Sequence, residues 1–329
     1  MKTAAALLLI FALCGCSKLA VFEPSKIDDR LSYDERLDSP ITLRNADGAT
    51  LENGQIISRK KIAVERLEKG FSLLAIDGEY AIAADKNGAL IFYDKDGKTK
   101  RFSFKEPIVS ASTDGAIIAA VSKTNACRII EIDTGKTLFF SQEKPALAVS
   151  DRLARALIGK EQAIIPSLDG KLLVVSRASA TIVKEIAVGS EEFFGNIIFL
   201  GEHGGYAIAA TNNRVLSIAP NGTQRSRDLD VRFLSLQKSG LYIFTTDGEI
   251  LLVSGTLATL SSARLLYARF VAAAEKNGVL WAVEQSGYAA RFSDNLQNVK
   301  IYELPDAIRA PVYADERGAW HYDKLARWR

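Results

Sequence analysis

The residue types that most often perform chemistry in proteins are scarce in this sequence. It contains two histidines, His203 and His321, and three cysteines. The histidines lie in separate repeats, and neither has a carboxylate or cysteine beside it at the spacing of metal ligands, so both are interpreted as turn or rim residues. Cys127 lies between a turn and an apolar stretch, where a small buried hydrophobe fits better than a nucleophile. The sequence therefore predicts no catalytic residue, no metal site and no bound cofactor.

Motifs and composition point away from several other function classes. No segment matches a phosphate-binding glycine loop, a nucleophile elbow or a zinc-protease helix. The chain has 42 lysines and arginines against 39 aspartates and glutamates. This near balance implies neither a nucleic acid nor an acidic surface as partner.

The N-terminus carries a signal for export and anchoring. A short positive start, Met1-Lys2, precedes an apolar run at residues 4–13 that is too short to span a bilayer. The run ends in Leu13-Cys14-Gly15-Cys16, which resembles the lipobox of bacterial lipoproteins. The resemblance implies a signal peptide at residues 1–15, cleavage before Cys16 and lipid attachment to that cysteine. The alternative is an ordinary cleaved signal that happens to contain a cysteine.

The residues after the lipobox suggest a location and a tether. Ser17 follows the lipidated cysteine, whereas enterobacterial lipoproteins kept at the inner membrane have aspartate there. The resemblance thus implies a periplasm-facing anchor in the outer membrane, with the inner membrane as the alternative. Residues 16–40 are rich in charge and are expected to form a flexible tether with a reach of roughly 27 Å. With Cys14 removed and Cys16 lipidated, Cys127 is the remaining thiol, so a core rather than disulfides must hold the exported protein together.

Turn dipeptides recur through the rest of the chain about every 40 residues, a spacing typical of propeller blades. They share an apolar stretch on either side and are Asp77-Gly78, Asp114-Gly115, Gly159-Lys160, Gly204-Gly205, Ser239-Gly240, Asn277-Gly278 and Arg317-Gly318. A second turn follows most of them about ten residues later, as at Asn87-Gly88 and Asp247-Gly248. Each unit is therefore expected to be a four-stranded meander. Its inner strands are apolar because neighbouring blades cover both faces, and its outer strand is mixed, as at residues 98–104.

The repeats predict an all-β fold, a β-propeller at residues 41–329. Seven first turns favour seven four-stranded blades, with eight as the alternative count. The last unit ends after about three strands, between Trp320 and Trp328. Residues 41–64 are expected to supply one or two strands without a blade of their own. Pairing of the N-terminal with the C-terminal strands would then close the ring and remove its open edges.

One repeat carries a family resemblance. Residues 130–139, Ile-Glu-Ile-Asp-Thr-Gly-Lys-Thr-Leu-Phe, are similar to the repeat of pyrroloquinoline-quinone-type propellers, with Phe139 where those repeats have tryptophan. Together with the lipobox and the length, the chain resembles the BamB family, propeller lipoproteins of the outer-membrane barrel assembly machinery. The resemblance implies a non-catalytic scaffold that binds other envelope proteins. A quinoprotein-like enzyme or ligand binder that uses the central channel is the alternative, as is a scaffold of another envelope machine.

Two motifs are candidate partner sites. Asp228-Leu229-Asp230 is similar to an Asp-x-Asp that the BamB family carries before a blade, which implies that Asp228 and Asp230 contact a partner. The alternative is that both are solvated carboxylates paired with Arg225, Arg227 or Arg232. Between two blades, Glu191-Glu192-Phe193-Phe194-Gly195 places two aromatic residues where burial is not required. Phe193 and Phe194 are thus either an exposed anchor for a partner or core packing at a blade boundary.

Overall fold

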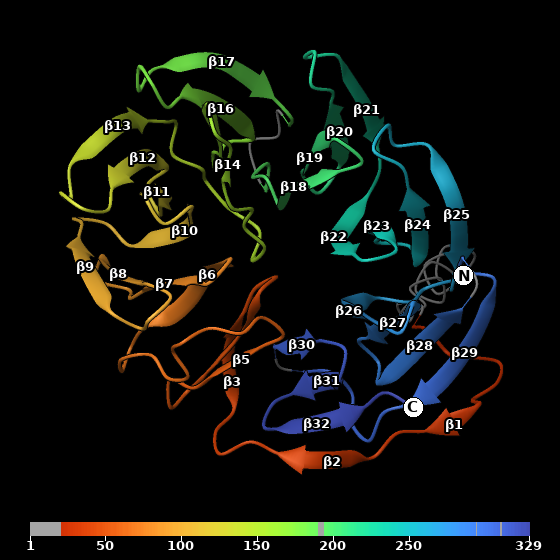
Figure 1. Ribbon diagram of the computed structural model, residues 1–329. Helices are drawn as coiled ribbons and strands as arrows, with labels where there is room; N and C mark the ends of the chain where they lie inside the picture. The colour runs from red at the N-terminus through yellow and green to blue at the C-terminus, as the bar shows by residue number, and fades with distance from the viewer. Residues whose placement is uncertain (1–20, 190–193, 294, 310) are drawn as a thin grey trace, which may run out of the picture.

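The structure is a computed structural model that describes residues 21–189, 194–293, 295–309 and 311–329. The regular elements of this part of the chain are β-strands, and none of its residues forms a helix long and apolar enough to cross a membrane. The strands form eight sheets that stand side by side in a ring around a central axis (Figure 1). The chain is therefore an all-β propeller. We number its blades 1 to 8 in the order in which the chain forms their innermost strands.

The first four blades follow one another along the chain. Blade 1 contains β3 (Ile41–Arg44), β4 (Gly48–Leu51) and β5 (Ile56–Ser58). Blade 2 contains β6 (Ser72–Asp77), β7 (Tyr80–Ala84), β8 (Ala89–Tyr93) and β9 (Thr99–Ser103). Blade 3 contains β10 (Ile108–Thr113), β11 (Ile117–Ser122), β12 (Ala126–Glu131) and β13 (Thr137–Gln142). Blade 4 contains β14 (Leu157–Ile158), β15 (Gln162–Pro166), β16 (Lys171–Ser176) and β17 (Ile182–Ala187).

The last four blades include two strands from the start of the chain. Blade 5 contains β18 (Phe199–His203), β19 (Tyr206–Ala210), β20 (Arg214–Ile218) and β21 (Gln224–Asp228). Blade 6 contains β22 (Val231–Gln237), β23 (Gly240–Thr245), β24 (Glu249–Val253) and β25 (Thr259–Arg264). Blade 7 contains β26 (Phe270–Lys276), β27 (Val279–Glu284), β28 (Tyr288–Ser293), β29 (Asn298–Glu303) and β1 (Asp29–Arg30). Blade 8 contains β30 (Val312–Ala314), β31 (Gly318–His321), β32 (Lys324–Arg327) and β2 (Tyr33–Arg36).

The ring has eight blades, the alternative count, rather than seven. Each of the seven predicted first turns lies where the first strand of a blade meets the second. Residues 41–64, expected to lack a blade of their own, instead form most of blade 1 around an eighth turn at Asp47-Gly48. Blade 1 has three regular strands. A short segment runs beside β5 in place of a fourth, and there the Ile56 N–H donates to the Glu65 carbonyl at 3.0 Å.

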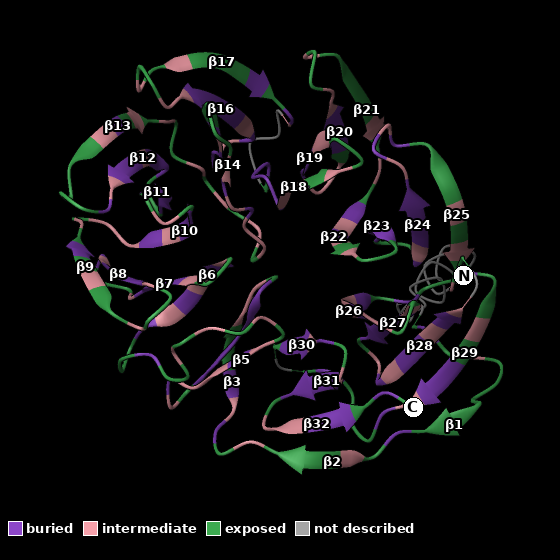
Figure 2. Cartoon of the chain, in the orientation of Figure 1, coloured by how far each residue is buried: buried purple, intermediate pink, exposed green. Residues whose placement is uncertain are grey.

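Burial follows the position of a strand in its blade. All six residues of β11 and of β23, which lie inside their blades, are buried. None of the residues of the outer strand β21 is buried. Figure 2 shows the same change from buried inner strands to exposed outer strands around the ring. The expected contrast between apolar inner and mixed outer strands is confirmed, because inner strands have neighbours on both faces and outer strands are wet.

The core consists of separate clusters, one between each pair of adjacent blades. The strand β11 shows how one strand serves two of them. Its Ile118 and Ala120 join the cluster shared with blade 2, and its Ile117, Ala119 and Val121 join the cluster shared with blade 4. Alternate side chains point to opposite faces of a strand, so an entirely apolar strand fills two interfaces at once. Each blade therefore depends on its two neighbours.

Strands from both ends of the chain meet in blade 8. The strand β2 pairs antiparallel with β32, with Tyr33 opposite Ala326. Beyond β32 the Trp328 ring stacks on Trp281 of blade 7 with 4.8 Å between ring centroids. The Trp328 indole N–H donates to the carbonyl of Asp315 at 2.7 Å. The C-terminal tryptophan is thus a core residue that joins blades 7 and 8.

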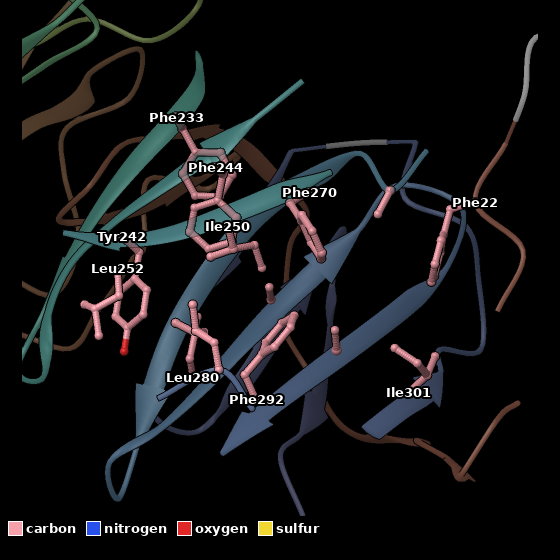
Figure 3. Close-up of a cluster of buried hydrophobic side chains, with 14 residues drawn as sticks. Phe22, Phe233, Tyr242, Phe244, Ile250, Leu252, Phe270, Leu280, Phe292 and Ile301 are labelled. Carbon is pink, nitrogen blue, oxygen red and sulfur yellow. The ribbon is translucent and has the colours of Figure 1, made fainter. Parts of the chain in front are cut away.

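Residues 21–40 lie on the propeller, unlike the flexible tether expected at residues 16–40. Phe22 is buried and packs edge-on against Tyr288 with 5.7 Å between ring centroids. Figure 3 shows Phe22 at one end of the cluster between blades 6 and 7. The strand β1 pairs parallel with β29, and the Asp28 carboxylate accepts the Ile301 N–H at 2.9 Å. Cys16, the predicted lipidation site, lies outside the described residues.

Candidate functional site

The alternating strand directions give the ring two different faces. Turns between the second and third strands of a blade share one face with the connections that lead from one blade to the next. We call this face the connection face, and we call the other, formed by the remaining turns, the turn face. Asp228 ends β21, residues 229 and 230 join β21 to β22, and Phe194 lies between β17 and β18. Both predicted partner motifs therefore lie on the connection face, at neighbouring blade boundaries.

The Asp228-Leu229-Asp230 motif borders a shallow, open depression of about 380 Å³ on the connection face. Asn213, in the turn between β19 and β20, and Arg214, the first residue of β20, complete its lining. Two backbone hydrogen bonds fix the motif there: the Leu229 N–H donates to the Asn213 carbonyl at 3.0 Å, and the Val231 N–H donates to the Asn212 carbonyl at 2.6 Å. We call this depression the acidic depression. Hydrogen bonds to the turn of blade 5 therefore hold the backbone of the motif.

The ion pairing at the acidic depression differs from the pairing expected. Asp228 pairs with Arg214, with 2.7 Å between Oδ1 and Nε, and both side chains are well exposed. Arg227, one of the expected partners, instead donates to the carbonyl of Leu257 at 3.2 Å. Arg232 donates to a backbone carbonyl in blade 7. The Asp228 pair is formed across adjacent strands, and an exposed pair of this kind contributes at most about 1 kcal/mol.

Phe194 belongs to an exposed apolar patch. Its side chain is 52% exposed, and its backbone has a φ of +56°. The Phe194 N–H donates to the Ala148 carbonyl at 3.0 Å, which brings it beside Leu147 and Val149, two further exposed apolar residues. We call Leu147, Val149 and Phe194 the apolar patch. Phe193 lies outside the described residues.

The two connections that carry the apolar patch are bound to each other. The fully buried Asn196 accepts the Ser150 N–H at 2.7 Å and donates to the Arg152 carbonyl at 3.0 Å. The Ala154 N–H donates to the Ile197 carbonyl at 3.0 Å. The sequence did not single out Leu147 and Val149. The length of the connection from β13 to β14 could have pointed to these two residues, because long ordered loops often carry binding residues.

The same connection sends an arginine across the channel. Arg155, beside the first strand of blade 4, pairs with Asp47 of blade 1 at 2.8 Å and with Asp77 of blade 2 at 2.9 Å. Asp47 is almost fully buried, and it also pairs with Lys60 at 2.6 Å and accepts the Ile76 N–H at 2.9 Å. A ligand that reached this depth of the channel would have to displace these partners.

A second arginine crosses the channel nearer the connection face. Arg152 donates to the Val271 carbonyl of blade 7 at 2.8 Å, and its guanidinium lies 4.5 Å from the centre of the Phe233 ring. Burial, and then the nearby charges of Arg44 and Arg232, lower the pKa of Arg152 to about 9. The guanidinium therefore remains charged at neutral pH. The sequence pattern did not single out Arg152 and Arg155, because the residues that they contact lie 119 and 108 positions away in the chain.

The remaining candidates for chemistry lie in packed surroundings. Cys127 is fully buried, and burial raises the pKa of its thiol to about 12, which leaves it a poor nucleophile. His203 contacts the Val253 carbonyl at 3.0 Å through Nε2. His321 is largely buried, with Nδ1 at 3.3 Å from the Tyr33 hydroxyl. Over residues 21–329, apart from the six that are not described, no three His, Cys, Asp or Glu side chains form a group that could hold a metal ion.

Comparison with known proteins gives relatives of two kinds, while no protein-family model matches the chain. Two curated relatives from Helicobacter pylori, strains J99 and 26695, are both named plasminogen-binding protein PgbB. They are 26% and 25% identical to this chain over 347 aligned residues and cover 91% of it. The match takes in 64% of each PgbB protein, so the chain spans less than two thirds of the length of these relatives.

Solved structures settle the fold. BamB from Moraxella catarrhalis superposes with a TM-score of 0.65 at 15% identity and covers 88% of this chain and 96% of its own. The C-terminal WD40 domain of Sif2 also reaches a TM-score of 0.65, at 12% identity over 92% of this chain and all of its own. The chain has a BamB-like β-propeller fold. Identities this low show the fold alone.

Proposed function

We propose that this chain is a lipid-anchored, non-catalytic propeller of the bacterial envelope that binds another envelope protein through its connection face. The observation that carries the proposal is the gathering of the acidic depression and the apolar patch on one face of a rigid ring. An exposed aromatic residue beside aliphatic ones, with charged groups nearby, is the usual composition of a protein-binding surface.

The relatives support a binding role of this kind. The PgbB proteins, matched along 91% of the chain, are named for binding a protein. The chain shares the fold of BamB. The sequence resemblance to the BamB family makes the barrel assembly machinery one candidate partner. The lipobox at Cys16 supplies the anchor, and Ser17 after it favours the outer membrane. Together these features support an envelope scaffold over an enzyme.

The test is capture of the partner from native membranes after mild crosslinking. The double variant Asp228→Ala and Asp230→Ala should lose the captured protein and keep its melting temperature. Exposed carboxylates outside buried networks change stability by about 0.5 kcal/mol or less, whereas loss of a desolvated charged contact in an interface costs about 2–5 kcal/mol of binding. A barrel-assembly protein as the main captured species would favour a BamB-like role, and a different envelope complex would favour a scaffold of that machine.

A matched control separates the proposed surface from general charge loss. Asp96 and Asp133 are exposed carboxylates in turns of the turn face, and Asp96→Ala with Asp133→Ala changes the net charge by the same amount. The control should retain the captured protein. Loss of capture in both double variants, or in neither, would contradict a docking role for Asp228 and Asp230.

Plasminogen is a second candidate partner. The observation that favours it is the length of the match to PgbB, which runs over almost the whole propeller. Purified protein should then bind immobilised plasminogen saturably. Binding that is absent for the purified propeller would remove plasminogen as a candidate and leave envelope partners.

A further inference from the structure

The start of the described chain is fixed to one edge of the ring. Phe22 is buried between blades 6 and 7, where it contacts Tyr288. Tyr288 follows the turn that joins β27 to β28, and turns of this type belong to the connection face. Phe22 is therefore held at the outer edge of the connection face, between blades 6 and 7 (Figure 3).

Few residues separate this fixed point from the proposed lipid anchor. Residues 17–21 lie between Cys16 and Phe22, and six residue steps span at most about 20 Å when fully extended. If Cys16 carries lipid, as the proposed function holds, the edge of the ring around Phe22 cannot move farther than this from the bilayer. The free tether expected from the sequence would have allowed every orientation, and the docked segment does not.

Exposed apolar side chains lie at this same edge. Val21 is 56% exposed, and Leu266 and Tyr267, in the connection from β25 to β26, are 54% and 50% exposed. Two backbone hydrogen bonds hold this connection in place. The Leu265 N–H donates to the Gly248 carbonyl at 3.0 Å, and the Ala268 N–H donates to the Leu265 carbonyl at 2.9 Å. Leu265 and Ala268 pack into the cluster that contains Phe22, so the two residues between them are presented outward.

We propose that Val21, Leu266 and Tyr267 form a membrane-contact edge that rests on the lipid surface. A tyrosine with an apolar ring and a polar tip suits the headgroup region of a bilayer. A few inserted side chains add a second attachment to acyl chains that already hold the protein. The lipid-anchored ring then has one orientation, with blades 6 and 7 toward the membrane. The apolar patch, at the boundaries of blades 3, 4 and 5, remains on the part of the ring farther from the bilayer.

The test compares how close two positions near blade 7, one on each face of the ring, come to lipid. Leu266→Cys, on the connection face, and Asn277→Cys, in the first turn of blade 7 on the turn face, are each labelled with an environment-sensitive fluorophore. Cys127 stays unlabelled because it is fully buried. The full lipidated protein is reconstituted on vesicles of phosphatidylethanolamine and phosphatidylglycerol that contain spin-labelled lipids as quenchers.

Flotation of the vesicles is measured first, because it reports the anchor separately from the orientation. Flotation with several-fold stronger quenching at position 266 than at position 277 is the expected result. Flotation with equal quenching at both positions would overturn the membrane-contact edge and leave the anchor in place. Failure to float would overturn the anchor and the edge together. Shielding of position 266 in native membranes without quenching in pure-lipid vesicles would show a protein partner there and also overturn the proposal.

Discussion

At the scale of single residues, Arg155 makes ion pairs that link blade 4 with blades 1 and 2 across the channel. Replacing Arg155 by methionine keeps an unbranched apolar stem, removes the guanidinium, and leaves Asp47 with Lys60 and the Ile76 N–H as partners. A hydrogen bond to a charged group contributes about 1.5–3 kcal/mol, so the variant should lose about 2 kcal/mol in the free energy of unfolding, measured with urea.

An exposed pair provides the control for this prediction. Arg101 pairs with Glu68 on the surface, and both side chains are about half exposed. Arg101→Met should therefore lose about 0.5 kcal/mol or less. Equal losses of unfolding free energy in the two variants would show that the ion pairs of Arg155 in the channel stabilise the protein no more than an exposed pair does.

His321 makes the closing blade sensitive to acid. Burial lowers the pKa of His321 from its ordinary 6.5, and the charge of Lys324 lowers it as well, against the opposing effects of Asp306 and Asp323. The unfolded chain therefore binds a proton more readily than the folded chain. Stability from this group is complete above the ordinary pKa and is lost as the pH falls through about 6.5 toward the lower folded value.

The histidine prediction compares urea unfolding at about pH 7 and about pH 5, where histidine changes charge and most carboxylates do not. The wild-type protein should lose more stability between these two conditions than His321→Asn does. Other groups contribute equally to both proteins and cancel in the comparison. The same loss in both proteins would contradict a role for His321.

Residues that meet from distant parts of the chain explain what sequence analysis could not find. Asp47 of blade 1 and Arg155 beside blade 4 are 108 residues apart in the sequence, and they meet because the arginine side chain reaches across the channel. The pairing of Asp228 with Arg214 likewise depends on the register between β20 and β21. The residue types at the acidic depression were identifiable, whereas their partners required the structure.

At the scale of elements, glycines in the second turn of a blade have a role that other residues cannot fill. Gly248 has a φ of +87°, and a Cβ there would overlap the Leu265 carbonyl oxygen. Left-handed backbone alone costs a non-glycine residue about 1–2 kcal/mol, and overpacking adds about 1–3 kcal/mol. Gly248→Ala should therefore lose roughly 3 kcal/mol in the free energy of unfolding.

Gly278 is the matched control for Gly248. It has a similar φ of +77° but nothing within 4 Å of an added Cβ. Gly278→Ala should lose only the backbone cost of about 1 kcal/mol. A loss as large as that of Gly248→Ala would mean that close packing against the blade connection is not what requires glycine at position 248.

The first turns of the blades show why the sequence predicted seven blades and not the eighth. Seven first turns were identified because each combines a turn residue with apolar strands on both sides. The eighth, Asp47-Gly48, has the same dipeptide but precedes Gly78 by 30 residues, because blade 1 has no regular fourth strand. The spacing of about 40 residues between first turns therefore fails at blade 1, and the sequence pattern did not reveal that blade.

The strands β1 and β2 were missed for a different physical reason. An outer strand has little buried surface, so its side chains can be as polar as those of a linker. The segment Tyr33-Asp34-Glu35-Arg36 has the charged composition of a flexible tether, yet its backbone pairs with β32. Composition alone does not distinguish a rim strand from a disordered segment.

At the scale of the whole molecule, the ring depends on contacts between neighbours and on its closure. Each cluster of the core is shared by two adjacent blades, so no blade has a core of its own. The first strands of the described residues, β1 and β2, lie on blades 7 and 8, so this N-terminal segment is joined to the same region that closes the ring. A rigid ring of this kind holds surfaces from distant segments in fixed relation, as at the connection face.

Site-specific photocrosslinking in living cells tests whether the connection face binds a protein. A photoreactive amino acid replaces Phe194 in one variant and Phe140, on the outer strand of blade 3, in the other. The two side chains are similarly exposed, at 52% and 55%. We expect a discrete protein adduct from position 194 and none from position 140. No adduct from position 194, or the same adduct from both positions, would contradict protein binding by the connection face.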